Sequence, residues 1–420
     1  MTVVRPFRAL RYDPARVDLG RVVVPPYDVI TAEERETLYA RDPHCAVRLE
    51  LTRDVADESS TDYTEVAETL AAWRRSGVLT GDAARAFYAM RQRFRAPDGR
   101  ELVRDGFFAA LRLESYDARV VRPHERTMAG PKADRLRMLR ATRANLSSVF
   151  FLYEDPEEAL AATLADAFDS EDTARARDAS GVELSLAPLR EPETIDVIER
   201  FLGERPVVIA DGHHRYETAL TYRDEQNASG DAPAAWTLGF FANAYAPGTL
   251  LLPIHRVIRK AKLPTEAAWR ERMPGWSQAA YPLRGPEHVA QALAEHLEPL
   301  AGRPAFAADD ASGILRVFSR PEPLGERLMV KVAEDEILAG VFGLTADDIR
   351  DGAVSFPKSA ERAATEVRAG EGTVAIYLNP LAPEDVFRVT AAGGRMPQKS
   401  TFFAPKIPTG LVFRLHEESA

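Results

Sequence analysis

The sequence has only one cysteine, Cys45, among its 420 residues. A single cysteine cannot form an intramolecular disulfide, and the absence of a cysteine cluster excludes a cysteine-based zinc site. No apolar run reaches the length of about 20 residues that a membrane-spanning helix requires. Residues 1–10 contain arginines but no apolar core of the kind found in signal peptides. We therefore expect a cytoplasmic protein without a membrane partner.

The chain also lacks an excess of basic residues, since its formal net charge is −10 at pH 7. Proteins that coat nucleic acid usually need a positive face to neutralise phosphates. The acidic balance argues against a nucleic-acid partner but is compatible with a local basic pocket. Three common catalytic signatures are absent as well. Residues 393–395, Gly-Gly-Arg, do not form a Walker loop, and there is no Gly-x-Ser-x-Gly elbow and no His-Glu-x-x-His helix.

Strand-like and helix-like patterns alternate along the whole chain without an internal repeat. A chain of this length is too long for one typical core and predicts two or three packed units. We expect a mixed α/β fold with three parts: a core domain over residues 1–260, a second α/β segment over 261–365, and a C-terminal segment over 366–420 that returns to the cleft of the core. Residues 155–180, rich in alanine and acidic residues, predict a solvent-exposed helix.

Two local signals fix the ends of predicted elements. Thr31 followed three residues later by Glu34 is a capping box, so a helix is expected to begin there. Tyr27 and Asp28, which follow two prolines, then lie on a rigid corner between a strand and this helix. The sequence Pro-Asp-Gly at residues 97–99 separates two strand-like runs and predicts a hairpin turn.

The sharpest motif lies at residues 207–216. The run Val-Val-Ile-Ala at 207–210 predicts a short buried strand, Gly212 a tight turn, and Tyr216 onward a helix. The first amides of such a helix have no partner inside the helix and point at whatever lies in front of it. A phosphate gains these donors together with the helix dipole, about 0.3–1 kcal/mol when exposed. The pattern therefore predicts an anion-binding turn.

The side chains of this turn can add chemistry to it. Arg215 offers a forked, charge-assisted contact to an anion. His213 and His214 can transfer protons near neutral pH, and Asp211 can orient one of them or hold a magnesium ion. The alternative interpretation is that Asp211 only caps the helix and that both histidines are surface residues.

A second charged segment runs from Arg122 to Thr127 and is followed by Lys132 and by Arg135 at a predicted helix start. Polar loops between a strand and a helix often carry functional sites. His124 and Glu125 can serve as base and metal ligand, and Lys132 can meet a phosphate. The alternative is an ordinary solvated loop.

A third segment, residues 397–410, alternates lysines, hydroxyls and aromatics. On a strand, Lys399 and Thr401 would face one side and Ser400 the other, with Lys406 further along. The alternative is an exposed edge guarded by lysines. Weaker signals are His255 and Arg256 at a predicted strand end, with a structural role as the default for His255, and Asn145 with Ser147 before the predicted strand at 149–153.

Six short segments carry a resemblance over nearly the whole chain. They are Pro25-Pro26-Tyr27-Asp28-Val29-Ile30, His124-Glu125-Arg126-Thr127, Pro131-Lys132-Ala133-Asp134-Arg135-Leu136, Ala210-Asp211-Gly212-His213-His214-Arg215-Tyr216, Pro253-Ile254-His255-Arg256 and Met396-Pro397-Gln398-Lys399-Ser400-Thr401-Phe402-Phe403. In this order they resemble the bacterial and archaeal family filed as domain of unknown function 1015. One departure is Leu146-Ser147-Ser148, where a proline is expected before the next strand.

The turn at residues 211–215 is similar to the phosphate-binding turn of the ParB and sulfiredoxin superfamily. That superfamily includes nucleotide-binding chromosome-partition proteins, ATP-using sulfiredoxins and free serine kinases. The resemblance implies an α+β fold with a ParB/sulfiredoxin-like core and large inserted and C-terminal α/β segments. It also implies ATP, ADP or another nucleotide as ligand. The expected phosphate or nucleotide contacts are Gly212, His214, Arg215, Lys399, Ser400, Thr401 and Lys406, with Tyr27, Asp28, Thr127, Lys132, Arg135, Asn145, His255 and Arg256 as further cleft residues.

Three functions are compatible with these residues. The one we favour is phosphoryl transfer from a nucleotide to a small hydroxyl-bearing substrate, with His124, Glu125, His213 or Asp211 as catalytic groups and Mg²⁺ on Asp211 or Glu125. The second is a metal-assisted phosphoesterase, in which water replaces the hydroxyl acceptor. The third is a non-catalytic nucleotide-binding switch of the ParB type, in which the ligand locks a conformation or a homodimer.

Overall fold

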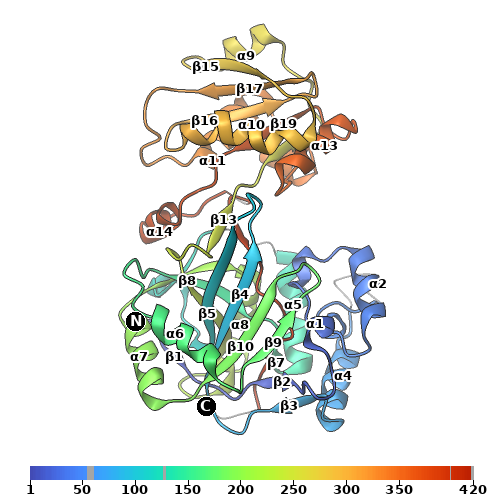
Figure 1. Ribbon diagram of the computed structural model, residues 1–420, viewed down its shortest axis with the longest axis vertical. Helices are drawn as coiled ribbons and strands as arrows, with labels where there is room; N and C mark the ends of the chain where they lie inside the picture. Colours follow the sequence, from blue (N-terminus) through green and yellow to red (C-terminus); the bar gives the residue numbers. More distant parts are fainter. Residues whose placement is uncertain (54–60, 126–128, 398, 418–420) are drawn as a thin grey trace. The chain divides into compact units, whose positions relative to one another are not determined.

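The computed structural model describes residues 1–53, 61–125, 129–397 and 399–417. The chain divides into two compact units (Figure 1). The first unit contains Met1–Leu250, Thr390–Gly393 and Pro405–Ala420, and the second contains Leu251–Val389 and Gly394–Ala404. Both combine helices with a sheet, so the mixed α/β class predicted from the sequence is confirmed.

A large mixed sheet forms the centre of the first unit. Within the described residues its strand order is β6-β11-β8-β12-β5-β4-β10-β9, and β1 pairs with β5. Most neighbours are antiparallel, whereas β11 with β6 and β12 with β8 are parallel. The strands are β1 Val4–Arg5, β4 Phe87–Arg95, β5 Glu101–Arg112, β6 Val121–Pro123, β8 Val149–Tyr153, β9 Ala174–Arg177, β10 Glu183–Leu189, β11 Val207–Asp211 and β12 Trp236–Asn243.

Aromatic stacking between the central strands holds this sheet together. Phe241 stacks on Phe107 and on Phe151, with ring centroids 5.4 and 5.1 Å apart. Gly106 makes room for a further aromatic residue, because a Cβ there would lie 2.4 Å from the ring of Phe240. Burial of such large side chains supplies most of the stabilising free energy of a core.

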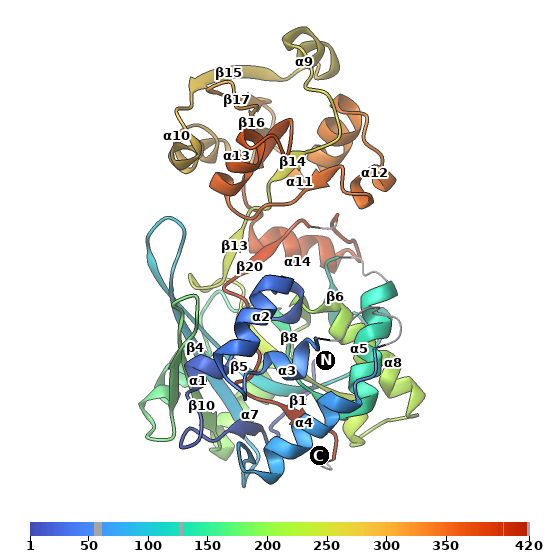
Figure 2. The ribbon, with the colours of Figure 1, turned by 90° about the vertical axis from the view of Figure 1, so that its right-hand side faces the viewer.

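The helices of the first unit pack on this sheet and on two small strand pairs. Figure 2 shows α5 and α8 side by side, and the two helices are in contact. The predicted capping box at the start of α2 is present, with Thr31 and Glu34 bonding each other's amides. The helices are α1 Leu19–Val22, η1 Tyr27–Val29, α2 Ala32–Arg41, α3 Val47–Glu50, α4 Thr64–Arg75, η2 Tyr116–Ala118, α5 Ala129–Thr142, α6 Ala161–Asp166, η3 Ala167–Asp169, α7 Pro192–Gly203, α8 His213–Glu225 and η4 Pro233–Ala235; the strand pairs are β2 Leu10–Tyr12 with β3 Leu79–Gly81, and β7 Ala144–Asn145 with β21 Arg414–Leu415.

Two predictions about local structure are wrong. Residues 155–180 do not form one exposed helix, because α6 and η3 end at Asp169 and β9 then pairs with β10 at the edge of the sheet. Tertiary pairing overrides helix propensity here. Lys399 does not lie on a strand either, since its φ of 58° is left-handed and β20 covers only Phe402–Ala404.

The second unit is built on an antiparallel sheet with the order β15-β17-β16-β19-β14-β18. Helices α10 and α13 cover one face, where Val257, Ala307 and Tyr377 are buried. Its elements are β14 Arg256–Ile258, α9 Glu266–Arg272, β15 Ser277–Pro282, η5 Pro286–His288, α10 Val289–His296, η6 Glu298–Leu300, β16 Ala305–Asp309, β17 Ile314–Ser319, α11 Met329–Val332, η7 Ala333–Val341, α12 Ala346–Arg350, β18 Val354–Ser355, α13 Ala360–Arg368 and β19 Val374–Leu378; β13 Leu250–Leu252 and α14 Pro383–Ala391 lie at the borders of the units.

No helix within the described residues is both long enough and apolar enough to cross a lipid bilayer.

Candidate functional site

The strand, turn and helix predicted at residues 207–216 are present. Strand β11 ends at Asp211, helix α8 begins at His213, and Gly212 stands between them as the N-cap. Gly212 has a φ of 91°, in the left-handed region that favours glycine. A Cβ at this position would lie 2.9 Å from the guanidinium carbon of Arg215. The turn therefore depends on glycine both for its backbone conformation and for the approach of Arg215.

The N-cap residue of α8 does not cap the helix, because Gly212 has no side chain to offer. Among the described residues, none accepts a hydrogen bond from the backbone amides of His213 or Arg215, whereas the next amide, that of Tyr216, donates to the Gly212 carbonyl at 3.0 Å. Two donors at the positive end of a helix dipole are thus left for another partner.

Two cations share the carboxylate of Asp211 beside this helix start. Its Oδ1 accepts from Lys406 Nζ at 2.5 Å, and its Oδ2 accepts from Arg215 Nη2 at 2.8 Å. Burial alone would raise the pKa of Asp211, but Lys406 and Arg215 outweigh burial and hold that pKa well below its ordinary value. Asp211 is therefore ionised, and the three groups together keep one net positive charge next to the free amides.

His213 and His124 join the turn to the loop after β6. Their ring centroids are 4.7 Å apart, and the His124 amide donates to His213 Nε2 at 3.3 Å. His124 Nδ1 donates to the Ile209 carbonyl at 2.5 Å, and its Nε2 lies 3.7 Å from Glu125 Oε1. Burial, followed by the nearby His124, lowers the pKa of His213 to about 3. His213 is therefore neutral at neutral pH, and its Nε2 accepts the His124 amide, which ties the loop to the turn. Its catalytic role stays a prediction.

The lowered pKa of His213 predicts that acid weakens the first unit. In the unfolded chain this histidine takes up a proton near pH 6.5, whereas in the folded chain the buried ring stays neutral down to about pH 3. The stabilisation is therefore complete above pH 6.5 and is lost as the pH falls toward 3, by up to about 1.4 kcal/mol per pH unit. Urea unfolding between neutral pH and about pH 5 should show this loss for the natural chain and a shallower one for His213→Asn. His288→Asn, at an exposed histidine, is the control; an unchanged slope in His213→Asn would contradict the assignment.

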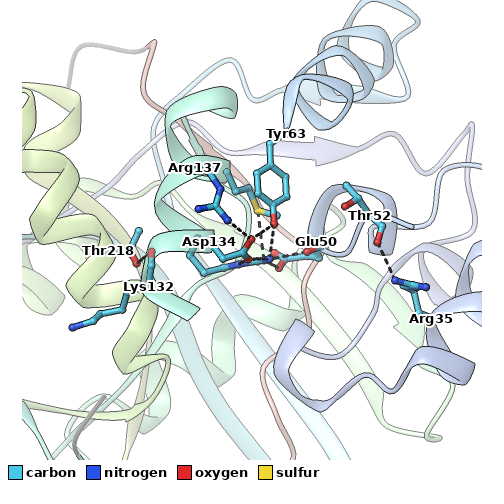
Figure 3. Close-up of polar contacts among 10 residues, drawn as sticks. Arg35, Glu50, Thr52, Tyr63, Lys132, Asp134, Arg137 and Thr218 are labelled. Atoms are coloured by element: carbon cyan, nitrogen blue, oxygen red, sulfur yellow. Dashed lines mark hydrogen bonds and ion pairs between the residues drawn. The ribbon is translucent and has the colours of Figure 1, made fainter. Parts of the chain in front are cut away.

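A buried polar network lies at the start of α5 (Figure 3). Asp134 Oδ1 accepts from the Tyr63 hydroxyl at 2.6 Å, and Asp134 Oδ2 accepts from Arg135 Nη2 at 2.6 Å. Arg137 reaches the same carboxylate at 3.4 Å. Arg135 also donates to the backbone carbonyl of Glu50 at 3.0 Å, which ties α5 to α3.

Loss of the Tyr63 hydroxyl is expected to weaken this network. Tyr63→Phe removes a hydrogen-bond donor from the buried side chain of Asp134 and should lower the free energy of unfolding by about 1.5–3 kcal/mol. The comparison is Tyr281→Phe, whose hydroxyl bonds to no described residue. Equal effects of the two substitutions on urea unfolding would mean that the Tyr63 bond adds nothing.

Glu50, which no sequence motif singled out, is a buried carboxylate of the first unit. The side chain is 1% exposed, and its Oε2 lies 3.6 Å from Arg135 Nη1. Its Oε1 has no hydrogen-bond partner among the described residues. Burial raises the pKa of Glu50 above its ordinary value although Arg135 and Arg215 oppose the rise. The available signal was a glutamate between two leucines, Leu49 and Leu51, where burial of a charge needs a reason.

The proline corner lies in the same neighbourhood as Glu50 and the turn. The ring of Tyr27 is 4.2 Å from the guanidinium carbon of Arg135. Burial raises the pKa of Tyr27 to about 12, against the opposing influence of Arg135 and Arg215. Asp28 also acts electrostatically on Arg215 and on Glu50. Ring contacts and electrostatic interactions therefore link four parts of the first unit: Tyr27 and Asp28, the end of α3, the start of α5 and the 211–215 turn.

Two other predicted site residues of the first unit, Lys132 and Asn145, form hydrogen bonds with other parts of that unit. Lys132 Nζ donates to Glu217 Oε2 at 2.8 Å, so it is paired across α5 and α8. His214 is half-buried, and burial lowers its pKa. Asn145 Oδ1 accepts from the Leu238 amide at 3.2 Å and from Arg414 at 3.1 Å, which joins three segments of the fold. Thr127 lies outside the described residues.

Five predicted site residues belong to the second unit. They are His255, Arg256, Lys399, Ser400 and Thr401, whereas Lys406 belongs to the first unit and contacts the turn. The single cleft expected for both groups stays a prediction.

The donors for the predicted Mg²⁺ do not fit a metal in this arrangement. Within the described residues no three histidine, cysteine or acidic side chains gather as a metal site. Both oxygens of Asp211 are occupied by cations, and Glu125 lies beside His124. A metal on Asp211 would have to displace Lys406 or Arg215, so the metal role stays a prediction.

The fold and the turn define a mixed α/β protein in which helix α8 begins beside the Asp211 carboxylate and the two cations that bond it. A model of the family described as "Protein of unknown function (DUF1015)" matches residues 4–288. The chain belongs to this family, as its sequence motifs indicated.

Solved structures show a weaker likeness. The chain is similar to a conserved hypothetical protein from Pyrococcus furiosus, with 12% identity over 74% of this chain and 96% of the other and a TM-score of 0.34. A free serine kinase in complex with AMP matches with 13% identity over 73% and 92% and a TM-score of 0.34. C-terminally truncated SbnI from Staphylococcus aureus matches with 11% identity over 74% and 90% and a TM-score of 0.38. No curated protein matches the chain. Because TM-scores this low cannot support a functional argument, we rely on the residues of this chain.

Proposed function

We propose that the first unit binds a phosphate group of a nucleotide at the 211–215 turn. The observation that supports this is the uncapped start of α8, with the amides of His213 and Arg215 left without a described acceptor. Lys406 and Arg215 both bond the carboxylate of Asp211, the residue that ends β11 just before the turn. An anion there gains backbone donors, a helix dipole and two cations. That the anion belongs to a nucleotide is inferred from the resemblance of the turn to the ParB and sulfiredoxin superfamily.

We further propose that the bound nucleotide donates its phosphoryl group to the hydroxyl of a small molecule. Such a transfer needs a cradle for the phosphates and a group that accepts the hydroxyl proton. Glu50 fits the second role better than His213, because one of its oxygens is unoccupied and its pKa is raised. A carboxylate whose pKa is shifted toward the working pH is a better base at that pH.

A non-catalytic switch is the second candidate. An arriving phosphate would compete with Asp211 for Lys406 and Arg215, and that exchange alone can alter the turn. The metal-assisted phosphoesterase has no such observation in its favour, because the described residues offer no cluster of metal ligands.

A transfer assay with the purified full chain separates the candidates. The chain is incubated with γ-labelled ATP and a panel of amino acids, sugars and other small hydroxyl compounds. Phosphoryl transfer predicts label in one acceptor; a switch predicts ATP binding with no label transferred and none released as phosphate. Release of labelled phosphate without any acceptor would favour the phosphoesterase. Absence of ATP binding would reject the nucleotide assignment.

A further inference from the structure

The second unit brings together three segments that the function proposed for the first unit does not use. The amide of His255 donates to the Pro357 carbonyl at 2.9 Å. Arg256 Nη2 donates to the Lys399 carbonyl at 3.3 Å. Lys358 Nζ lies 4.1 Å from the ring centre of Phe402. The segments around residues 255, 357 and 400 are therefore neighbours, although about 100 and 150 residues of sequence separate them from the first.

Arg256 carries a buried charge without a carboxylate beside it. The residue is 3% exposed, and its guanidinium donates to the carbonyls of Ile254 and Lys399. Among the described residues, no carboxylate lies within ion-pair distance of it. The carboxylate that acts on it from further away, Glu334, is 2.8 Å from Lys331. Burial lowers the pKa of Arg256 to about 10, which still leaves it charged at neutral pH. Isolating a charge from water is costly unless a counter-ion joins it.

Two residues near Arg256, Lys399 and His255, also have a side-chain nitrogen without a partner among the described residues. The Lys399 side chain is exposed and forms no ion pair with a described residue, and its left-handed φ of 58° is uncommon outside glycine. His255 is 3% exposed, and its Nδ1 has no hydrogen-bond partner among the described residues. Burial, followed by the charge of Arg256, lowers the pKa of His255 to about 3, so its ring is neutral.

We propose that the second unit has an oxyanion site of its own, in which Arg256, Lys358 and Lys399 bind the phosphate group of a phosphorylated small molecule. Arg256 supplies a buried charge, and the two exposed lysines supply charges from neighbouring segments. Neutral His255 offers a ring nitrogen to a protonated or anionic oxygen, according to its tautomer. A guanidinium with flanking ammonium groups suits a tetrahedral anion with several oxygens. The site does not depend on nucleotide binding by the first unit.

Phosphate titration tests this proposal in the full chain carrying Gly212→Ala, which weakens any competing site at the turn. With inorganic phosphate as the probe in calorimetry, we expect binding to persist in that background. Adding Lys399→Ala should weaken it about tenfold, the size of one lost charge-assisted hydrogen bond. Lys331→Ala is the control, because Lys331 is an exposed lysine of the same unit that is already paired with Glu334 and Asp335. Both lysines are exposed, so neither substitution should unfold the chain.

A crystal of the full chain soaked in tungstate locates the site directly. An anomalous peak within hydrogen-bond reach of Arg256 and Lys399 is the expected result. Equal phosphate affinity with and without Lys399, or a peak elsewhere and none at Arg256, would overturn the proposal. Acetate added as a competitor should leave phosphate binding unchanged. Displacement by acetate at equal concentration would mean that the site selects carboxylates, against the assignment to phosphate.

Discussion

A chain with Glu50→Gln is expected to bind nucleotide normally and to transfer the phosphoryl group about 10²–10⁴-fold more slowly. Glutamine keeps the size of the side chain but cannot accept the hydroxyl proton. It removes the charge that lies 3.6 Å from Arg135, but Arg135 keeps its bond to Asp134, so the chain should still fold. The measurement is kcat and KM for the acceptor found in the labelling screen, together with the nucleotide Kd.

The pH dependence of transfer adds a second readout for Glu50. Because burial raises the pKa of Glu50, the natural chain should lose activity at mildly acidic pH, as the base becomes protonated. Glu50→Gln should abolish this acid limb. Glu199→Gln is the matched control, since burial also raises the pKa of Glu199, which lies in α7. An unaltered kcat in Glu50→Gln, or an equal loss in Glu199→Gln, would remove Glu50 from the proposed mechanism.

Gly212→Ala is expected to weaken nucleotide binding by tenfold or more. The left-handed conformation costs a residue with a Cβ roughly 1–2 kcal/mol. The new Cβ would also lie 2.9 Å from the Arg215 guanidinium carbon, which forces Arg215 or the helix start to shift. Either movement separates the free amides from the cations beside them. Isothermal titration with ADP and with inorganic phosphate measures the effect.

Gly99→Ala isolates the contribution of backbone strain. Gly99 has a similar φ of 86° in the hairpin between β4 and β5, and a Cβ there meets nothing within 4 Å. It should lose a comparable amount of stability and keep full nucleotide affinity. Equal nucleotide affinities of the Gly212→Ala and Gly99→Ala chains would show that the turn does not hold the ligand.

Local signals predicted the parts of the fold that depend on neighbours in sequence. The capping box at Thr31, the turn at Gly99 and the strand and helix on either side of Gly212 each rest on a few adjacent residues. The helix expected over residues 155–180 failed because β9 gains a distant partner, β10, which no local pattern reveals. Lys399 was misplaced for a related reason, since its left-handed backbone is stabilised by the fold around it.

One contact of the candidate site could be predicted, because its two charged residues both lie in sequence motifs. Lys406 and Asp211 were both expected at the turn, and they meet there at 2.5 Å although 195 residues separate them. Glu50 was missed because its importance comes from burial and from an unpaired oxygen, and neither is visible in a short helix. The lowered pKa of His213 was not predicted either, because it comes mainly from burial. Burial is the property that a sequence conveys least well.

A crystal structure of the full chain with ADP tests the central claim most directly. We expect a phosphate oxygen within about 3 Å of the His213 and Arg215 amides, with Lys406 turned from Asp211 toward the ligand. ADP bound with its phosphates away from α8, or those two amides occupied by another group of the protein at saturating ADP, would contradict the account.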